Sequence, residues 1–198
     1  MKSDLIFRIV LAILFILVIA TRKSFENRSA RVAVRKLKQD LDSRTSVLIQ
    51  SLLLTLSNLG IIAYLIHPSW MTWSAIPLPK WAQWIGTVFG IAGAGLLIWT
   101  HRVLGENFFG GTKIRQGHQL ITAGPYRRVR HPMYTAFILL GLAWFLLSGN
   151  WFIGGFWLAA TLLVVISRVN EEEKMMLAEF GAEYQSYMRQ TGRFLPKL

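Results

Sequence analysis

Five long apolar runs joined by basic connectors are the feature that most constrains the fold of this chain. The hydrocarbon core of a bilayer is about 30 Å thick and is crossed by a helix of roughly 20 apolar residues. We expect transmembrane helices at about residues 5–20, 46–66, 81–100, 133–147 and 151–166. Only Ser-Gly-Asn separates the last two, which predicts a tight antiparallel hairpin. The expected fold class is an all-α, polytopic membrane helical bundle, a single integral membrane domain over residues 1–198.

The composition excludes an ordinary soluble domain. Hydrophobic residues make up 53% of the chain, charged residues only 16%, and the mean hydropathy is +0.41. The net charge of +12 would suggest nucleic acid in a soluble protein, but here the charges gather between apolar runs and we expect no nucleic-acid partner. Without cysteine the chain has no thiolate nucleophile or disulfide, and its four histidines are not spaced as metal ligands, so we expect no metal site.

The basic residues predict an orientation. Of the 22 Lys and Arg residues, 19 lie in the connectors 21–44 and 101–130 and in the segment 168–198. These three stretches fall on one side of a five-helix bundle, so the positive-inside rule predicts N-out and C-in, in the cytoplasmic membrane. No small-x-small cleavage motif precedes the first basic run, so we expect the first helix to be retained and not cleaved as a signal peptide.

The glycine-rich run from Gly90 to Gly95 superficially resembles a nucleotide-binding loop, but its context argues against that function. It lies inside the third apolar run, follows no strand and lacks the GxGxxG spacing. Gly86 and Gly90 instead form a GxxxG pair, which predicts close helix packing.

The first candidate for chemistry is the loop 117–134, GHQLITAGPYRRVRHPMY. Its Gly-Pro pair predicts a turn, and Pro132 suits the first turn of the following helix. Backbone N–H groups at a helix start can bind an anion. With Tyr126 and His131 close by, this loop is expected on the cytoplasmic side as a small-molecule cradle. Taken alone, His131 would be interpreted as an interfacial capping residue.

The second candidate is the segment RVNEEEKMMLAEFGAEYQSYM, which begins at Arg168. Its apolar residues recur at helical spacing, so we expect the last membrane helix to continue as a C-terminal amphipathic helix. Arg168 and Glu172 then share a face. On a surface such a pair is an ordinary salt bridge, but at a membrane exit facing a loop rich in His and Tyr it is a candidate functional site.

These two motifs, in this order, resemble the isoprenylcysteine carboxyl methyltransferases and the related phospholipid methyltransferases. The resemblance covers roughly residues 104–196, which is the expected cofactor-binding part. It implies an integral membrane enzyme that uses S-adenosylmethionine without a Rossmann domain. It also implies a lipophilic or lipidated methyl acceptor that enters from the bilayer and reacts on the cytoplasmic face.

Transferred position by position, the resemblance implies cofactor contacts and an acceptor contact. The cofactor contacts are His118, Gln119, Leu120, Ile121, Tyr126, His131, Pro132, Met133, Tyr134 and Glu172. Arg168 would bind the acceptor, and Arg168 and Glu172 would be the catalytic residues, with Glu171 as an alternative to Glu172.

Elementary chemistry agrees with these roles. A sulfonium cation favours a nearby carboxylate and aromatic faces. The methionine carboxylate of the cofactor would suit the backbone N–H groups of His131 and Met133. An acceptor carboxylate, with a pKa of about 4, is ionised at pH 7, requires no general base and could pair bidentately with Arg168.

Three other functions remain open at this point. A lipid headgroup amine could be the methyl acceptor, in which case Glu172 or His131 would have to act as the base. A membrane sterol reductase that uses NADPH has a partly similar C-terminal arrangement. A small basic membrane protein could also bind anionic lipid without catalysis, and we expect the connector 21–44 to face membrane lipids in any case.

Overall fold

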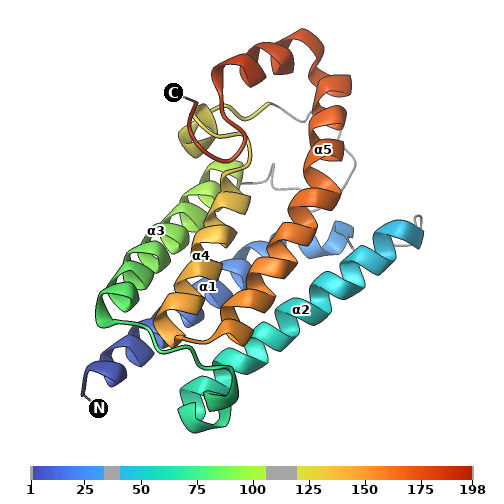
Figure 1. The fold of residues 1–198 in the computed structure, drawn as a ribbon. Coiled ribbons are helices and arrows are strands. Elements are labelled where there is room, and N and C mark those ends of the chain that lie inside the picture. The colour runs from blue at the N-terminus through green and yellow to red at the C-terminus, as the bar shows by residue number, and fades with distance from the viewer. Residues whose placement is uncertain (1, 34–40, 106–119, 198) are drawn as a thin grey trace.

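The computed structural model describes residues 2–33, 41–105 and 120–197, and these form a bundle of long helices (Figure 1). The elements are α1 (Lys2–Ala33), α2 (Leu41–Ile66), the short 3₁₀ helix η1 (Pro68–Ser74), α3 (Lys80–Leu104), the 3₁₀ helix η3 (Gly124–Arg127), α4 (Pro132–Ser148) and α5 (Trp151–Gln190). Within these ranges no β-strand is present, only two isolated bridges. The all-α membrane fold is therefore confirmed.

Each predicted apolar run lies in one of the helices α1 to α5. Four of these helices are long and apolar enough to cross a membrane, whereas α4 has 17 residues and is only about 25 Å long at 1.5 Å per residue. The part of α5 before Gly181, residues 151–180, is about 45 Å long at 1.5 Å per residue, well over the thickness of the hydrocarbon core. Only the apolar first part of α5, residues 151–166, is therefore treated as membrane-spanning, and the charged remainder projects beyond the bundle (Figure 1).

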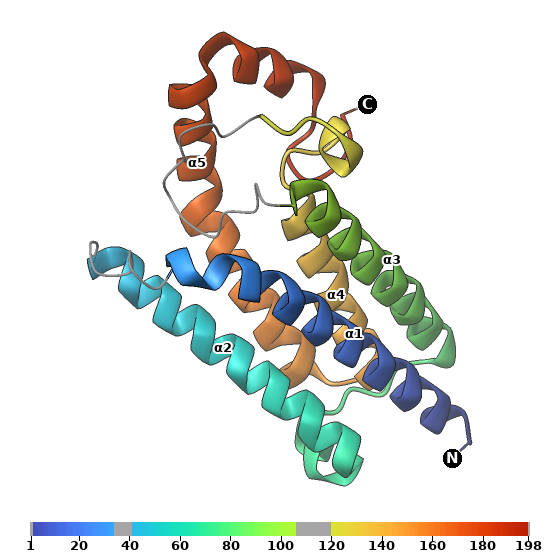
Figure 2. The same cartoon turned by 180° about the vertical axis from the view of Figure 1, so that it is seen from behind.

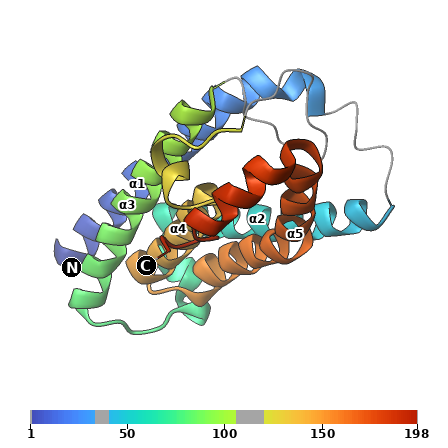
Figure 3. The same cartoon turned by 90° about the horizontal axis from the view of Figure 1, so that it is seen from above.

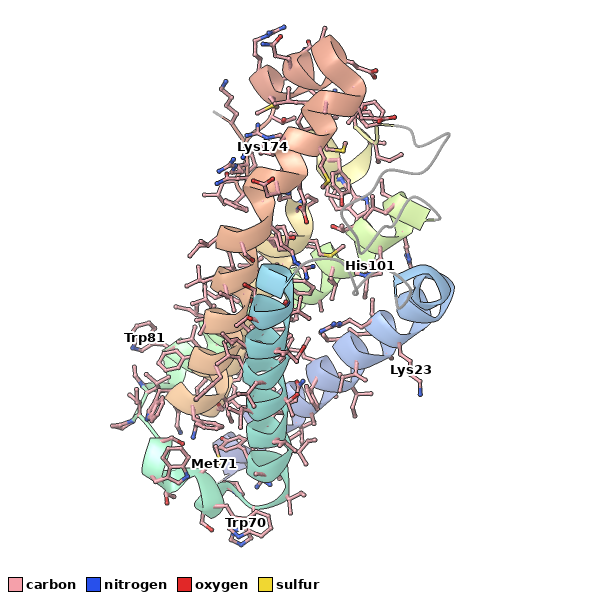
Figure 4. All side chains as sticks on the ribbon, turned by 90° about the vertical axis from the view of Figure 1, so that its right-hand side faces the viewer. Lys23, Trp70, Met71, Trp81, His101 and Lys174 are labelled. Carbon is pink, nitrogen blue, oxygen red and sulfur yellow. The ribbon has the colours of Figure 1, made fainter. Side chains whose placement is uncertain are left out.

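The chain runs up and down the bundle, so its two termini lie at opposite ends (Figures 1 and 2). The end at which α3 finishes and α4 begins is called the loop end here. The described helix ends that border the expected cytoplasmic stretches lie there, since α1, α3 and α5 end and α2 and α4 begin at this end (Figure 1). Trp70 and Met71 of η1 mark the opposite end (Figure 4).

α4 is the central helix, packed between α3 and α5, with α2 on the far side of α5. The core contains completely buried side chains from several of these helices, among them Leu97, Leu140, Trp144 and Ile153. The packing is close because small residues lie at the helix contacts. A Cβ atom on Gly86 would stand 2.7 Å from that of Leu146, so the GxxxG pair serves helix packing as predicted.

The predicted hairpin between α4 and α5 is present and well capped. Gly149 adopts the left-handed conformation (φ 58°), which glycine adopts without strain, and its N–H closes α4. Asn150 is completely enclosed and caps α5 by accepting a hydrogen bond from the Ile153 N–H at 3.2 Å. Its amide donates to the Met71 carbonyl at 3.0 Å, so the turn is also fixed to η1.

The predicted amphipathic extension is present, but it does not remain straight. Gly181 has φ 49° and ψ −121°, a backbone conformation available almost only to glycine, and the helix changes direction there. The final helical segment and the tail then fold back over the start of α4 (Figure 3). This return brings residues far apart in sequence into the same site.

Candidate active site

The loop before α4 is held in place by α3 and by the C-terminal tail. Gly124 has φ 60°, and a Cβ atom there would come within 2.6 Å of a Val103 methyl group, so only glycine allows η3 to lie this close to α3. On the other side the Gly192 N–H donates to the Arg128 carbonyl at 3.1 Å, and the Arg130 N–H donates to the Gly192 carbonyl at 2.9 Å. The loop therefore has a fixed path into α4.

His131 is placed at the N-cap of α4 by the same pairing. Its backbone N–H donates to the Arg193 carbonyl at 3.0 Å, and one turn later the Thr135 hydroxyl donates to the Phe194 carbonyl at 2.6 Å. The expectation that the His131 N–H is available for an anion is therefore wrong, because the tail has already taken this donor.

Glu172 lies within a cluster of aromatic and titratable side chains, as predicted. The Tyr134 hydroxyl donates to Glu172 Oε1 at 2.8 Å, and His131 Nδ1 lies 3.6 Å from Glu172 Oε2. The rings of His131 and Tyr134 have centroids 5.8 Å apart. Burial raises the pKa of Glu172, while the Tyr134 hydrogen bond and the charge of Arg168 oppose that shift. Arg168, half-buried one turn earlier, is thus electrostatically coupled to the cluster.

The His131 ring lies between two carboxylates. Its Nε2 is 3.2 Å from Glu173 Oε1, on the side opposite Glu172. Burial lowers the pKa of His131, an effect that the neighbouring Glu173 opposes. Because the pKa is below its ordinary value, the imidazole is neutral at pH 7.

Glu173 forms a buried ion-pair network that the sequence does not predict. Only 5% of this residue is exposed, and its Oε1 accepts from Arg130 Nε at 3.0 Å and from Arg193 Nε at 3.2 Å. Arg130 also donates to the Met188 carbonyl at 3.1 Å. Burial raises the pKa of Glu173, but hydrogen bonds from Arg193 and Arg130 outweigh burial and lower the pKa to about 2. This ionised carboxylate joins the loop, α5 and the tail.

The three consecutive glutamates have separate environments. Glu171 is exposed and pairs with Lys174 at 2.8 Å on the surface. Lys174 lies on the upper part of α5, at the opposite end of the molecule from Trp70 (Figure 4). Glu172 is therefore the carboxylate of this run that faces His131 and Tyr134, whereas Glu171 faces solvent.

The remaining predicted cofactor contacts differ in where they lie relative to the cluster. Tyr126 is close enough for Glu172 to affect its pKa, which burial raises, and its carbonyl accepts from the Tyr187 hydroxyl at 2.7 Å. Pro132 is completely buried in the first turn of α4, and Met133 packs on the hydrophobic core. Leu120 and Ile121 are half-buried. His118 and Gln119 lie outside the described residues.

A small cavity of about 50 Å³ lies beside Tyr134, between α1, α2, α4 and α5. Its walls are mostly apolar, with Phe137 and Trp157 among them, and Arg22 and Thr161 add polar groups. In the described ranges, no group of three or more His, Asp or Glu side chains could hold a metal ion.

Comparison with known proteins agrees with the sequence motifs. Residues 84–178 match the model of the isoprenylcysteine carboxyl methyltransferase (ICMT) family. This segment of the chain is similar to that family. The matched range includes most of α3, all of α4 and the part of α5 that carries Arg168 and Glu172, so it contains the described site residues of the cluster.

Two curated relatives and one solved structure extend this finding. Methanethiol S-methyltransferase 2 of Bradyrhizobium diazoefficiens is 32% identical over 143 residues, 64% of this chain and 53% of that protein. Protein-S-isoprenylcysteine O-methyltransferase of Schizosaccharomyces pombe is 31% identical over 86 residues, 43% of this chain and 36% of that protein. The structure of the eukaryotic intramembrane Ras methyltransferase ICMT has a TM-score of 0.51 and 22% identity, over 81% of this chain and 54% of that one. The structural likeness supports the fold, and the chain spans about half or less of the length of these proteins.

Proposed function

We propose that this protein is an S-adenosylmethionine-dependent methyltransferase that acts on a lipophilic acceptor at the loop end of the bundle. The observation that carries the proposal is the cluster of Tyr126, His131, Tyr134 and Glu172 next to Arg168. The cluster combines a carboxylate, aromatic rings and a guanidinium at a membrane exit, within the segment that matches the family.

The residues present suit the proposed cofactor. The Glu172 carboxylate and the rings of Tyr126 and Tyr134 would hold the sulfonium end, because a cation is favoured beside a carboxylate and aromatic faces. When bound, S-adenosylmethionine supplies an electrophilic methyl group. The Tyr134 hydrogen bond fixes the position of the carboxylate, so the protein arranges this charge before the cofactor binds.

Arg168 supports a carboxylate as the acceptor group, as in the isoprenylcysteine carboxylate of the yeast relative's name. A guanidinium can hold a carboxylate through two parallel hydrogen bonds, and an ionised carboxylate attacks without a general base. The role of the protein is then mainly alignment of the acceptor with the methyl group in a site that excludes water.

A thiol acceptor is the second candidate, favoured by the longer match to the methanethiol enzyme. A thiol must lose its proton before it attacks. His131 would accept this proton, because burial lowers its pKa and so keeps the imidazole neutral, and its Nδ1 lies 3.6 Å from Glu172 Oε2 within the cluster.

The packing of the helices indicates where an acceptor would enter. A Cβ atom on Gly141 would stand 2.6 Å from a Leu158 methyl group, so α4 and α5 are in close contact there and leave no opening. The cavity beside Tyr134 instead lies next to α1 and α2. We therefore place lateral entry on the α2 side of α5, and not between α4 and α5.

The test is methyl transfer by the purified full-length protein from labelled S-adenosylmethionine. Farnesylcysteine would be compared with its methyl ester, whose carboxyl group is blocked, and with a long-chain alkanethiol. Carboxyl methylation predicts transfer to farnesylcysteine alone, and Arg168→Ala should abolish it while S-adenosylhomocysteine still binds. Transfer to the alkanethiol alone would favour the second candidate, and transfer to none of the three would count against both.

A further inference from the structure

A second cavity lies on the other side of the α4 start, away from the Tyr134 cavity. Its volume is about 600 Å³, within the range of small-molecule sites, and it lies between α3, η3 and the C-terminal tail. Its walls are formed mainly by Leu96, Trp99, Pro132, Phe194 and Leu195. The groove is therefore apolar.

Two arginines give this groove a charged rim. Arg127 and Arg128 line it and are exposed. Within the described part of the chain, neither guanidinium has a hydrogen-bond or ion-pair partner, in contrast to Arg130 and Arg193 close by. Two adjacent positive charges without internal partners are complementary to an external anion.

The position of the groove selects an amphipathic ligand. Leu96 and Trp99 belong to the last three turns of α3, near the point where this helix leaves the apolar layer. Trp99 is 52% exposed, and tryptophan is enriched at the level of lipid headgroups. An apolar groove at this level, with cations at its rim, matches a molecule that has an acyl chain and an anionic head.

We propose that this groove binds an anionic phospholipid, with an acyl chain against Leu96, Phe194 and Leu195 and the headgroup phosphate between Arg127 and Arg128. The site is separate from the proposed methyl-transfer cluster, because Tyr134 and Glu172 are not among its lining residues. The lipid would bridge α3, η3 and the tail, and so bind to the same tail that fixes His131.

The test is native mass spectrometry of the full-length protein released from neutral detergent. Phosphatidylglycerol would be compared with phosphatidylcholine of identical acyl chains. We expect retention of phosphatidylglycerol to exceed that of phosphatidylcholine about thirty-fold, since each of the two arginines contributes roughly one kcal/mol to anionic lipid binding near a membrane surface and about 1.4 kcal/mol is a factor of ten. Equal retention of the two lipids would overturn the proposal.

Variants separate the headgroup contact from the chain contact. The double variant Arg127→Gln, Arg128→Gln should reduce phosphatidylglycerol to the phosphatidylcholine level, whereas the charge-matched control Lys80→Gln, Arg189→Gln, at two exposed positions outside the groove, should bind as wild type. Leu195→Asp should reduce both lipids, and as Leu195 is 71% exposed the variant should fold. Unchanged phosphatidylglycerol retention in either groove variant would refute the site. Displacement of the bound phospholipid by farnesylcysteine would also overturn it, because the groove would then belong to the methyl acceptor.

Discussion

At the scale of single residues, the three glutamates of α5 show how far sequence reasoning extends. Successive residues on a helix point about 100° apart, so Glu171, Glu172 and Glu173 cannot share a face. The resemblance selected Glu172, and the structure gives it Tyr134 and His131 as partners. The importance of Glu173 was not predictable, because its partners Arg130 and Arg193 are 43 and 20 residues distant and reach it only through the fold.

The first prediction concerns the stability provided by Glu173. Glu173→Gln leaves Arg130 without its charged partner in a buried position and should lower the free energy of unfolding by about 3 kcal/mol. The measurement is SDS-induced unfolding in mixed micelles at pH 7. Glu171→Gln, which changes an exposed ion pair, is the control and should stay within about 0.5 kcal/mol of wild type. An equal effect of the two substitutions would contradict the network.

The second prediction concerns how the stability provided by Glu173 depends on pH. Because the folded-state pKa of Glu173 is lowered to about 2 from 4.5, its ionised form stabilises the fold above about pH 4.5. This stabilisation is lost as the pH falls toward 2. The difference in unfolding free energy between wild type and Glu173→Gln should therefore shrink steadily from pH 5 to pH 3. A difference that is constant over this range would show that Glu173 is not held ionised by its partners.

At the scale of elements, the helices can be predicted from the sequence, but the folding of the C-terminal tail back onto the loop before α4 cannot. A long apolar run predicts each membrane helix, and the short polar sequence around Gly149 predicts the turn there. The change of direction at Gly181 interrupts a pattern that reads as a continuous helix. The pairing of the tail with the loop at Arg128 is a long-range backbone contact that no local periodicity encodes.

The third prediction tests that change of direction. Gly181→Ala should cost about 1 to 3 kcal/mol, because alanine strains at this positive φ even though nothing lies within 4 Å of a Cβ atom there. Since the tail also fixes His131, S-adenosylhomocysteine should bind the variant more weakly. Gly155→Ala is the matched control: it too has open space, but an ordinary helical backbone, and should be neutral or stabilising by up to about 1 kcal/mol. Equal changes in unfolding free energy for the two substitutions would mean that the fold does not depend on the change of direction at Gly181.

At the scale of the whole molecule, the up-and-down order of the helices places the methyl-transfer cluster and the lipid groove at the same end. The helix ends that border the basic stretches of the sequence lie there, and Trp70 of η1 lies at the other end (Figure 4). The orientation relative to the membrane follows from the distribution of Lys and Arg and stays a prediction.

The fourth prediction tests this orientation. Because the chain has no native cysteine, a single introduced cysteine can be labelled selectively. A membrane-impermeant maleimide applied to intact cells should label Trp70→Cys, and should label Lys174→Cys only after the membrane is permeabilised. Both positions are exposed in the structure. The reverse pattern would place the proposed active site outside the cell.

The most direct test of the central claim, a methyl-donor site at the loop end, is calorimetric titration of the detergent-solubilised protein with S-adenosylhomocysteine, with NADPH as the control ligand. We expect saturable binding of S-adenosylhomocysteine and not of NADPH. Binding of S-adenosylmethionine, which carries the sulfonium charge, should be weakened about ten-fold by Glu172→Ala and little affected by Arg168→Ala. Binding of NADPH alone, or of neither ligand, would contradict the claim.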